Sequence, residues 1–420
     1  MKRAYERLLE YVKIYTTSDE NSGTTPSAGR EFDLARILVE EMTAIGIRDA
    51  HVDDLCYVYG TIPASPGYEK APAVGFLAHL DTAPDFCGEQ VRPQIHEQYD
   101  GGEIRLGQSG RILSPEMFPD LKERIGQTLI TTDGTTLLGA DDKAGIAEIM
   151  TAAERILSAD REGSGRPHGK ICIAFTPDEE IGSGAADLDL EKFGARYAYT
   201  VDGDREEQIV YETFNACEAK FEIHGVNIHP GDAKNRMVNA GLIAARIVSM
   251  LPPYETPSCT EKYEGFYHVT SIEGTVEKAA VSMIVRDHSS ALFEARMQTL
   301  RHMEKMLNEA YGEGTVRLTI RQQYRNMAEK LQDCMHLIEN VKEIIRGMGK
   351  EPDVSPVRGG TDGAQLTFRG LPCPNLGTGG SAFHGPYEHI SAEAMDFVVG
   401  VIMRIVEKYA DAQDGHDRTD

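Results

Sequence analysis

The sequence predicts an α/β protein with a second, ferredoxin-like α+β module inserted into its main domain. Apolar runs at 73–80, 170–176 and 197–201 alternate with helical patterns, as buried strands do in a sheet that helices cover. From about residue 213 the pattern changes to the order β-α-β-β-α-β, which is typical of a ferredoxin-like module. After residue 327 the first pattern resumes. The inserted module therefore interrupts a single α/β domain.

Each helix is predicted from apolar residues at helical spacing, and each strand from a short apolar or alternating run. In the main domain we expect helices near 5–12, 32–42, 143–157, 335–345 and 395–405. In the module we expect strands at 217–225, 266–274, 278–287 and 315–324, and helices at 237–251 and 290–307. The expected boundaries are 1–212 and 327–412 for the main domain, 213–326 for the module and 413–420 for a tail.

Charge and cysteine content narrow the class of protein. With 43 Lys and Arg against 67 Asp and Glu, the 420 residues carry a formal net charge of −24. Such an acidic chain is not expected to bind nucleic acid or an anionic membrane surface. The seven cysteines include no CxxC pair, which predicts free thiols in a reducing compartment. No apolar run approaches the roughly 18 residues of a membrane span. We therefore expect a cytoplasmic enzyme.

Acidic residues and histidines follow several predicted strands, at the edge where open α/β sheets bind their ligands. His79 and Asp81 in "AHLDT" follow the first strand. One side chain can bind a metal while the other contacts that ligand without binding the metal itself. Such a pair is also common as a plain hydrogen-bonded pair. Asp141 and Asp142 precede the helix at 143–157. There they can cap the helix, bridge two cations, or do both.

The stretch "AFTPDEEIGSG" places three acids directly after the strand at 170–176. For Asp178 we expect a solvated acidic turn. Glu179 and Glu180 leave the strand in different directions, because adjacent side chains project differently. One carboxylate can therefore coordinate a metal while the other stands beside the attacking water as a general base.

Two further candidates complete the set. Asp202 follows the strand at 197–201, and His384 follows the Gly-rich "GTGGS". Each also suits an ordinary turn or loop. Each residue alone has an ordinary structural explanation, but coincidence explains a set of two histidines and several carboxylates at strand ends much less well. The chemistry of the set favours Zn²⁺, with Mn²⁺ or Co²⁺ as substitutes.

With these residues in place, the chain resembles the M20 family of dinuclear zinc peptidases, and within it the peptidase T group of tripeptide aminopeptidases. The resemblance covers nearly the whole chain, and several of its stretches are absent from M20 carboxypeptidases and deacylases. It is carried by "HLDTAPD" (79–85), "GQTLITTDGTTLLGADDKAGIAEIM" (126–150), "AFTPDEEIGSGA" (174–185), "AYTVDG" (198–203), "HPGDAK" (229–234), "EGFYH" (264–268), "RGGTDGAQL" (358–366) and "LPCPNLGTGG" (371–380).

The resemblance implies a zinc-exopeptidase-like catalytic domain that binds two Zn²⁺ ions per subunit. By motif, His79, Asp141 and Asp202 would hold one ion. Asp141 would bridge to the second ion, which Glu180 and His384 would also hold.

The resemblance also assigns roles beside the metals. Glu179 would be the general base, and Asp81 would orient His79 from outside the ligand set. In the family the peptide bond after the bridging aspartate tends to be cis, which here is the bond between Asp141 and Asp142.

The inserted module would be the lid of the family, and often its dimerisation surface, so a homodimer through this module is possible. His229 of "NIHPGDAK" matches a histidine that polarises the scissile carbonyl, and Arg286 of "IVRD" matches an arginine suited to a substrate carboxylate. Alternatively, His229 only shapes the turn before Pro230, and Arg286 pairs with Asp287 or a neighbouring helix.

The chain departs from the family pattern in two places. The family commonly has a small Gly-rich turn after the zinc-binding aspartate, whereas "VDGDREEQ" is charged, so we expect a differently shaped turn there. In "SAFHGPYEHIS", His389 is a rival to His384 as a metal ligand.

The favoured function is release of the N-terminal residue from tripeptides by water that two zinc ions activate. The alternative enzyme is an M20-type N-acyl amino acid deacylase or carboxypeptidase. A third hypothesis is a non-catalytic metal-dependent binding protein, against which Glu179 argues because a binding site needs no free base.

Overall fold

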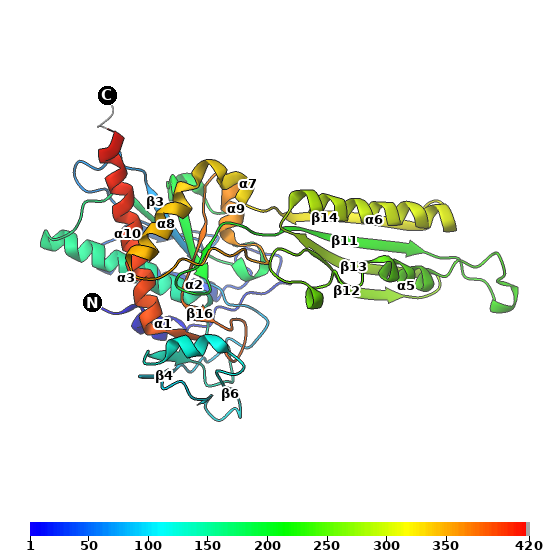
Figure 1. Cartoon of the computed structure of the whole chain (residues 1–420), viewed down its shortest axis with the longest axis horizontal. Helices are drawn as coiled ribbons and strands as arrows, with labels where there is room; N and C mark the ends of the chain where they lie inside the picture. Colours follow the sequence, from blue (N-terminus) through cyan, green and yellow to red (C-terminus); the bar gives the residue numbers. More distant parts are fainter. Residues whose placement is uncertain (417–420) are drawn as a thin grey trace. The chain divides into compact units, whose positions relative to one another are not determined.

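The computed structural model describes residues 1–416 of the chain. It forms two compact units, whose elements Figure 1 labels. Unit 1 contains Met1–Tyr211, Lys330–Ser355 and Thr361–Asp420, and unit 2 contains Glu212–Glu329 and Pro356–Gly360. The chain therefore leaves unit 1 and returns to it twice.

Unit 1 is built on a seven-stranded sheet with the order β1-β2-β8-β3-β9-β15-β10. The four central strands are parallel, β2 and β10 pair antiparallel to them, and β1 pairs antiparallel to β2. The strands are β1 (Arg48–Val52), β2 (Val58–Ile62), β3 (Val74–His79), β8 (Ile171–Thr176), β9 (Tyr197–Gly203), β10 (Ile209–Val210) and β15 (Asn375–Gly377). Because β3, β8 and β9 run in the same direction, the residues that follow them lie at one edge of the sheet.

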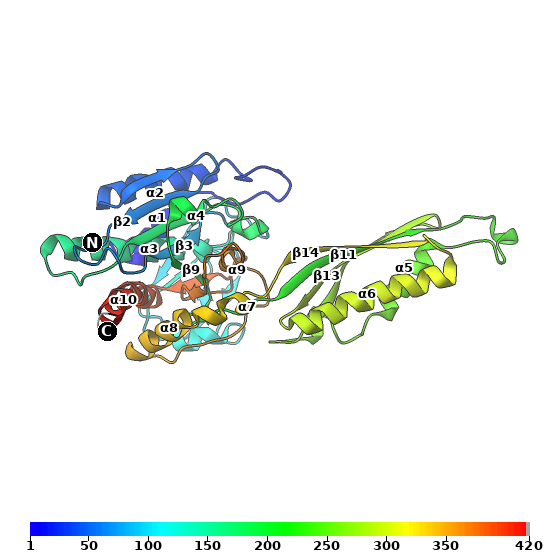
Figure 2. The same ribbon diagram turned by 90° about the horizontal axis from the view of Figure 1, so that it is seen from above.

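Helices cover both faces of this sheet, since alternate side chains of each strand point to opposite faces. Phe76 packs towards α3 and α10, whereas Leu77 packs in a cluster with α4 and α9. Helices α1, α3 and α10 contact one another, and α8 lies against α10 (Figure 2). The helices of unit 1 are α1 (Ala4–Tyr11), α2 (Glu31–Ile45), α3 (Ala140–Glu162), α4 (Leu190–Phe193), α8 (His336–Gly347), α9 (Asp362–Phe368) and α10 (Ala392–His416). Of the tail expected at 413–420, residues 413–416 belong to α10 and residues 417–420 lie outside the described part of the chain.

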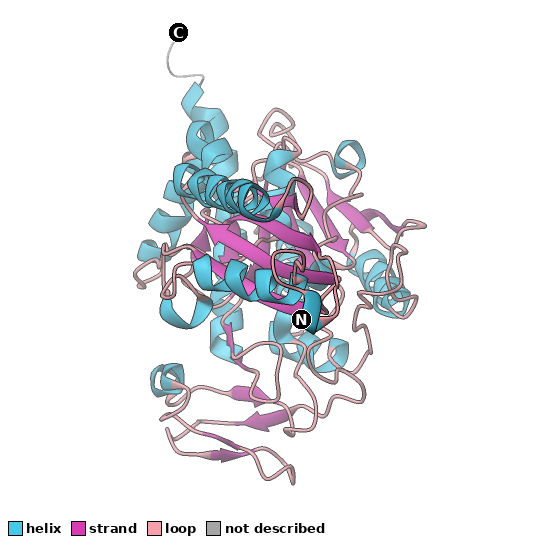
Figure 3. Cartoon of the chain, turned by 90° about the vertical axis from the view of Figure 1, so that its right-hand side faces the viewer, coloured by secondary structure: helices cyan, strands magenta, loops and turns pink. Residues whose placement is uncertain are grey.

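Two small sheets, which the sequence does not predict, complete unit 1. One has the order β16-β17-β7-β4, and the other pairs β5 with β6. Strands β4 to β7 lie at the bottom of the unit in Figures 1 and 3, below the large sheet. The short strands are β4 (Gln94–His96), β5 (Ile104–Arg105), β6 (Ile112–Leu113), β7 (Leu129–Thr131), β16 (Gly380–Ser381) and β17 (His389–Ser391). The pairing of β17 with β7 brings the segment that precedes α10 beside the segment that precedes α3.

Unit 2 has the predicted order β-α-β-β-α-β. Its antiparallel sheet runs β12-β13-β11-β14, and α5 and α6 pack on one face over a core that includes Phe221, Met283 and Phe293. Strand β13 alternates buried and less buried residues, as expected for a sheet with one covered face. The elements are β11 (Asn215–His224), α5 (Ala240–Met250), β12 (Phe266–Gly274), β13 (Lys278–Asp287), α6 (Ser290–Tyr311) and β14 (Val316–Tyr324). The remaining short helix, α7 (Ala328–Leu331), follows β14.

Within residues 1–416, no helix is long and apolar enough to span a membrane.

Candidate metal centre

Two histidines share one carboxylate at the edge of the large sheet. Oδ1 of Asp141 lies 2.9 Å from Nε2 of His79, and its Oδ2 lies 3.2 Å from Nε2 of His384. A second carboxylate stands beside each histidine: Oδ1 of Asp202 is 3.6 Å from His79 Nε2, and Oε2 of Glu180 is 3.0 Å from His384 Nε2. The five side chains thus form two groups of donors that meet at Asp141, which is the arrangement a bridging carboxylate needs.

Asp81 fixes both His79 and the acidic turn. Nδ1 of His79 lies 3.0 Å from the main-chain oxygen of Asp81 and 3.2 Å from its Oδ1. Because a carbonyl oxygen only accepts hydrogen bonds, Nδ1 carries a proton, and Nε2 is the ring atom that faces Asp141 and Asp202. The fully buried Asp81 carboxylate also accepts the main-chain N–H groups of Glu179 (3.0 Å) and Glu180 (3.1 Å).

The two aspartates at the start of α3 have different contacts: Asp141 lies between the two histidines, and Asp142 caps the helix. Asp142 also lies near His79 and Asp202. However, its oxygens already accept the main-chain N–H groups of His79 (3.1 Å) and Gly145 (3.2 Å), so Asp142 acts as a cap. Gly145 is required here, because a Cβ atom would lie 1.9 Å from the main-chain oxygen of Val201. The peptide bond between Asp141 and Asp142 is cis, as the resemblance implied.

The expectation of a solvated Asp178 is wrong. Asp178 is fully buried and adopts a left-handed conformation with φ of 59°. Its two carboxylate oxygens accept the main-chain N–H of Ser27 at 2.9 and 2.8 Å, and its own N–H donates to Glu31 at 3.2 Å. Asp178 therefore ties the acidic turn to the segment before α2.

Asp362, at the start of α9, holds both ends of the loop that carries Glu179 and Glu180. It accepts the Thr176 hydroxyl at 2.8 Å and the main-chain N–H of Ala185 at 2.7 Å. Sequence reasoning did not assign this residue, although it lies within "RGGTDGAQL". Its partners are almost two hundred residues away in sequence, so no local pattern reveals them.

Burial and crowding hold the site in an unusual charge state. Burial, followed by the charges of Asp202 and Asp362, raises the pKa of Glu179 well above its ordinary value. Burial and the charge of Asp141 raise the pKa of Glu180 to about 8. Hydrogen bonds to Asp141 and Glu180 raise the pKa of His384 to about 11. Burial and the crowding of negative charge together cause these shifts.

The donor set fits divalent cations. In the described part of the chain, Glu180 Oε1 is buried and has no hydrogen-bond partner. The closely spaced carboxylates and two imidazole nitrogens are borderline-hard ligands of the kind that Zn²⁺, Mn²⁺ and Co²⁺ accept. A bound cation would neutralise the charge that raises these pKa values.

His384 has a third carboxylate partner, and His389 lies elsewhere. Nδ1 of His384 is 3.3 Å from Oδ2 of the exposed Asp85. Asp85 lies within "HLDTAPD", but the sequence alone did not indicate a role for it. Nε2 of the buried His389 instead lies 2.8 Å from Oδ2 of Asp120. Of the two rival histidines, His384 is therefore the one beside Asp141 and Glu180.

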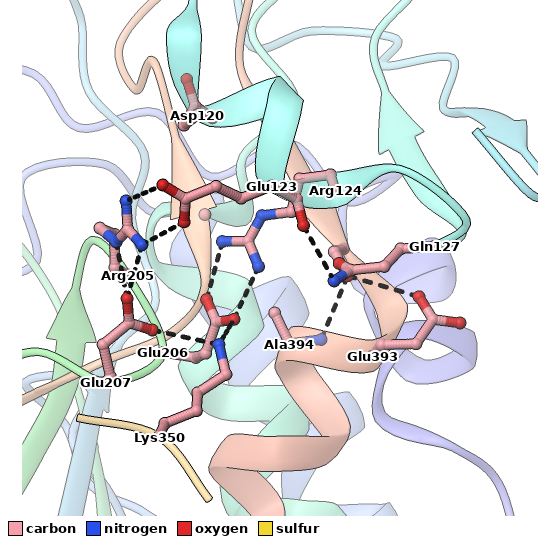
Figure 4. Close-up of polar contacts among 12 residues, drawn as sticks. Asp120, Glu123, Arg124, Gln127, Arg205, Glu206, Glu207, Lys350, Glu393 and Ala394 are labelled. Carbon is pink, nitrogen blue, oxygen red and sulfur yellow. Dashed lines mark hydrogen bonds and ion pairs between the residues drawn. The ribbon is translucent and has the colours of Figure 1, made fainter. Parts of the chain in front are cut away.

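The charged turn after Asp202 is an ion network, which Figure 4 shows. Arg124 and Glu206 form a two-pronged pair, with both hydrogen bonds 2.7 Å long and both side chains buried. Lys350 contacts Glu206 and Glu207, and Arg205 contacts Glu207. The network joins the segment after β9 to the 3₁₀ helix Pro119–Arg124. Charged pairs thus hold this segment where a small turn was expected from the family.

His229 and Arg286 belong to unit 2. His229 is exposed, and its Nδ1 accepts the main-chain N–H of Gly231 at 3.2 Å, so it does shape the turn. Arg286 does not pair with Asp287, which binds Arg296 instead. Nη1 of Arg286 donates to main-chain oxygens at 3.2 and 3.3 Å, and the guanidinium lies over the ring of Tyr324.

Curated relatives match the chain from end to end. It is 49% identical to a peptidase T of Alkaliphilus oremlandii over 412 residues, which are 98% of this chain and 100% of the relative. It is 50% identical to a peptidase T of Caldanaerobacter subterraneus over 410 residues, which are 97% of this chain and 99% of the relative. The chain belongs to the peptidase T family. It is therefore a peptidase of the M20 class.

Further comparisons agree with membership of the peptidase T family. A family profile described as "Peptidase dimerisation domain" matches residues 211–315. The fold resembles aminopeptidase PepT of Bacillus cereus (TM-score 0.76, 23% identity, 97% and 98% of the two chains). It also resembles a tripeptidase of Staphylococcus aureus (TM-score 0.77, 21% identity, 97% and 98%). A dinuclear metal binding M20 peptidase of Bacillus subtilis shares the fold more distantly (TM-score 0.65, 15% identity, 97% and 98%).

Proposed function

We propose that this peptidase T family member is a dinuclear metallo-aminopeptidase that releases the N-terminal residue of tripeptides. The observation that carries the proposal is the placement of Asp141, with one oxygen beside each of two histidines. The curated relatives are named peptidase T, and one structural neighbour is named a tripeptidase. These names support the substrate class.

In the proposed site, His79, Asp141 and Asp202 hold one divalent cation, and Asp141, Glu180 and His384 hold the other. We favour Zn²⁺, because two imidazoles and three carboxylates suit it, with Mn²⁺ or Co²⁺ as substitutes. When bound, the cations lower the pKa of water and polarise a carbonyl.

The chain's own residues would then move the proton and hold the substrate. Glu179 directly precedes the Glu180 ligand in the sequence, and burial and the charges of Asp202 and Asp362 raise its pKa. It would accept a proton from the attacking water and return it to the departing amine. Asp81 would keep His79 and the Glu179 main chain in place. His229 would polarise the scissile carbonyl, and Arg286 would bind the substrate carboxylate.

The assembly and compartment belong to the same proposal. The match of unit 2 to a peptidase dimerisation domain supports a homodimer. All seven cysteines are free, which supports a reducing compartment and hence the cytoplasm.

A peptide panel tests the proposal. Peptides of two to five residues, with free or blocked ends, are incubated with the protein in Zn²⁺, Mn²⁺ or Co²⁺, and the products are identified by mass spectrometry. We expect cleavage after the first residue of free tripeptides, and little cleavage of their N-acetylated forms. Preference for N-acylated substrates would favour the deacylase alternative. Removal of the C-terminal residue would favour a carboxypeptidase. Metal binding without turnover would favour a binding protein.

A further inference from the structure

Glu388 lies four residues after His384 and makes the most concentrated set of main-chain contacts near the metal centre. It is 1% exposed. Its Oε2 accepts the N–H groups of Leu138 (2.7 Å) and Gly139 (2.9 Å), and its Oε1 accepts the N–H of Asp141 (3.1 Å). One carboxylate therefore binds three main-chain donors almost 250 residues away in sequence.

These donors belong to the turn that leads into α3, which Asp142 does not serve, because Asp142 accepts the N–H of Gly145 further along the helix. The first N–H groups of a helix lack partners within the helix. The residue at the capping position is Gly139, which has no side chain to supply an acceptor. Glu388 supplies the missing acceptor for this kinked segment, in which Asp141 and Asp142 have non-helical dihedral angles. This explains why a carboxyl group is buried at position 388.

The same contacts connect two ligand-bearing segments. Asp141 carries the bridging carboxylate, and its own N–H is one of the three donors. His384 precedes Glu388 in the same short connection between β16 and β17. The other end of this connection is fixed, because His389 binds Asp120 and β17 pairs with β7. The position of the connection against α3 therefore determines how closely His384 approaches Asp141.

We propose that Glu388 is a positioning residue that sets the separation of His384 from Asp141 and so determines cation affinity at the Glu180–His384 position. The inference rests on the proposed two-cation site. It predicts an asymmetry between the two positions. His79 and Asp202 extend from β3 and β9 and have no contact with Glu388. Cation affinity at the His79–Asp202 position should therefore depend on Glu388 less than affinity at the Glu180–His384 position does.

The test measures stepwise Zn²⁺ affinity of the full-length protein by competition with a chelator. For Glu388→Ala we expect one of the two binding steps to weaken by about 10- to 100-fold, the usual cost of losing a group that orients metal ligands. The Zn²⁺ affinity of Glu388→Gln should lie between those of the wild type and Glu388→Ala, because the glutamine amide keeps only one oxygen to accept the main-chain N–H groups. His384→Ala, which removes a ligand, identifies the step that belongs to the Glu180–His384 position.

A matched control is available five residues along the chain. Glu393 also accepts a main-chain N–H, that of Thr128 at 2.8 Å, but its contacts are with Thr128, Ser391 and Arg3, none of which is a proposed ligand. Glu393→Ala should leave both binding steps unchanged. Hydrogen exchange of metal-free protein should show faster exchange at the Leu138, Gly139 and Asp141 amides in Glu388→Ala, and not in Glu393→Ala.

The possible outcomes are distinct. Unchanged affinity in both Glu388 variants, or equal weakening of both steps, would overturn the proposal, because Glu388 would then serve the fold in general. If Glu388→Ala does not fold, Glu388→Gln alone decides between these outcomes. Failure of the wild-type protein to bind two ions would instead count against the two-cation site itself.

Discussion

Three consecutive acids, Asp178, Glu179 and Glu180, show how burial and partners separate residues of similar type. Asp178 is buried and bound by the main chain of Ser27. Glu180 faces His384, and burial with the charges of Asp202 and Asp362 raises the pKa of Glu179 well above its ordinary value. A strongly shifted carboxyl group beside candidate metal ligands is a candidate for a chemical role.

Replacement of Glu179 tests that role directly. We expect Glu179→Ala to retain both metal ions but to lose turnover by a factor of about 10²–10⁴, the usual contribution of a general base. Metal content by elemental analysis and kcat on a tripeptide give the two measurements. Glu191→Ala, at an exposed position on α4, is the control and should match the wild type. Substantial hydrolysis by the metal-loaded Glu179→Ala protein would remove Glu179 from the base role.

Glu148 of α3 is a buried acid away from the ligands, and both of its oxygens lack partners in the described part of the chain. Burial, followed by the charges of Glu206 and Asp396, raises its pKa well above the ordinary value of 4.5. The folded state therefore keeps the proton that the unfolded state releases above about pH 4.5. Stability is consequently lost as the pH rises above this value.

For Glu148→Met we expect a gain in the free energy of unfolding of about 1–3 kcal/mol at pH 8, because an unsatisfied polar group is removed. The gain should be smaller at pH 5, where less of the unfolded wild-type protein is ionised. Urea unfolding at the two pH values measures it. Glu162→Met, at an exposed position of the same helix, should show no such gain. A gain that is independent of pH would show that Glu148 is not protonated in the folded state.

At the scale of elements, buried carboxylates rather than turns hold the catalytic loops in place. Asp81, Asp362 and Glu388 each accept main-chain N–H groups from a segment that carries a candidate ligand or base. Hydrogen bonds to charged groups are stronger than neutral ones, and they fix a loop without requiring regular structure. The segment after β9 is held differently, by the ion pairs of Figure 4.

The Arg124–Glu206 pair should therefore stabilise this segment only while both partners are present. Burial alone would raise the pKa of Glu206, but Arg124 and Lys350 lower it to about 2. We expect Arg124→Met to lower the free energy of unfolding by roughly 3 kcal/mol, because Glu206 is left buried with Lys350 alone. The double variant Arg124→Met, Glu206→Met should be more stable than Arg124→Met. Chemical denaturation of both single variants and the double variant measures the coupling. Additive losses would show that the two residues act independently.

At the scale of the whole molecule, unit 2 has two unpaired sheet edges, β12 and β14. Such edges are templates for pairing with another chain, and charged side chains discourage it. Strand β14 exposes Arg317 and Arg321, whereas positions 270–272 of β12 are exposed and uncharged, with Ile272 54% exposed. Strand β12 is therefore the edge better suited to an interface between copies of the chain.

We expect sedimentation equilibrium to give about twice the 46.3 kDa of one chain. Ile272→Lys should shift the protein towards the monomer, because it places a charge on the β12 edge. Thr319→Lys, on the β14 edge, is the matched control and should remain dimeric. A monomeric wild-type protein would contradict the proposed dimer, and a shift with Thr319→Lys alone would move the interface to β14.

Long regular patterns were predictable from the sequence, whereas contacts between distant carboxylates and main-chain groups were not. Strands β3, β8 and β9 and the order of unit 2 follow from apolar runs and spacing. The strands of two or three residues between Gln94 and Thr131 are too short to show a period. Asp178 was wrongly expected in solvent, because its partner Ser27 lies 151 residues away. Asp362 and Glu388 were not assigned for the same reason, although both lie close to stretches that the family resemblance includes.

The interleaving of the two units has a consequence for how the protein is made. Unit 2 is complete once Gly360 has been synthesised, whereas unit 1 still lacks β15, β17 and α10. Because domains tend to fold as they emerge from the ribosome, the inserted unit can finish folding first. His384 and Glu388 follow the last residue of unit 2 in the sequence. The proposed cation position that uses His384 therefore cannot be completed until after unit 2 has been synthesised.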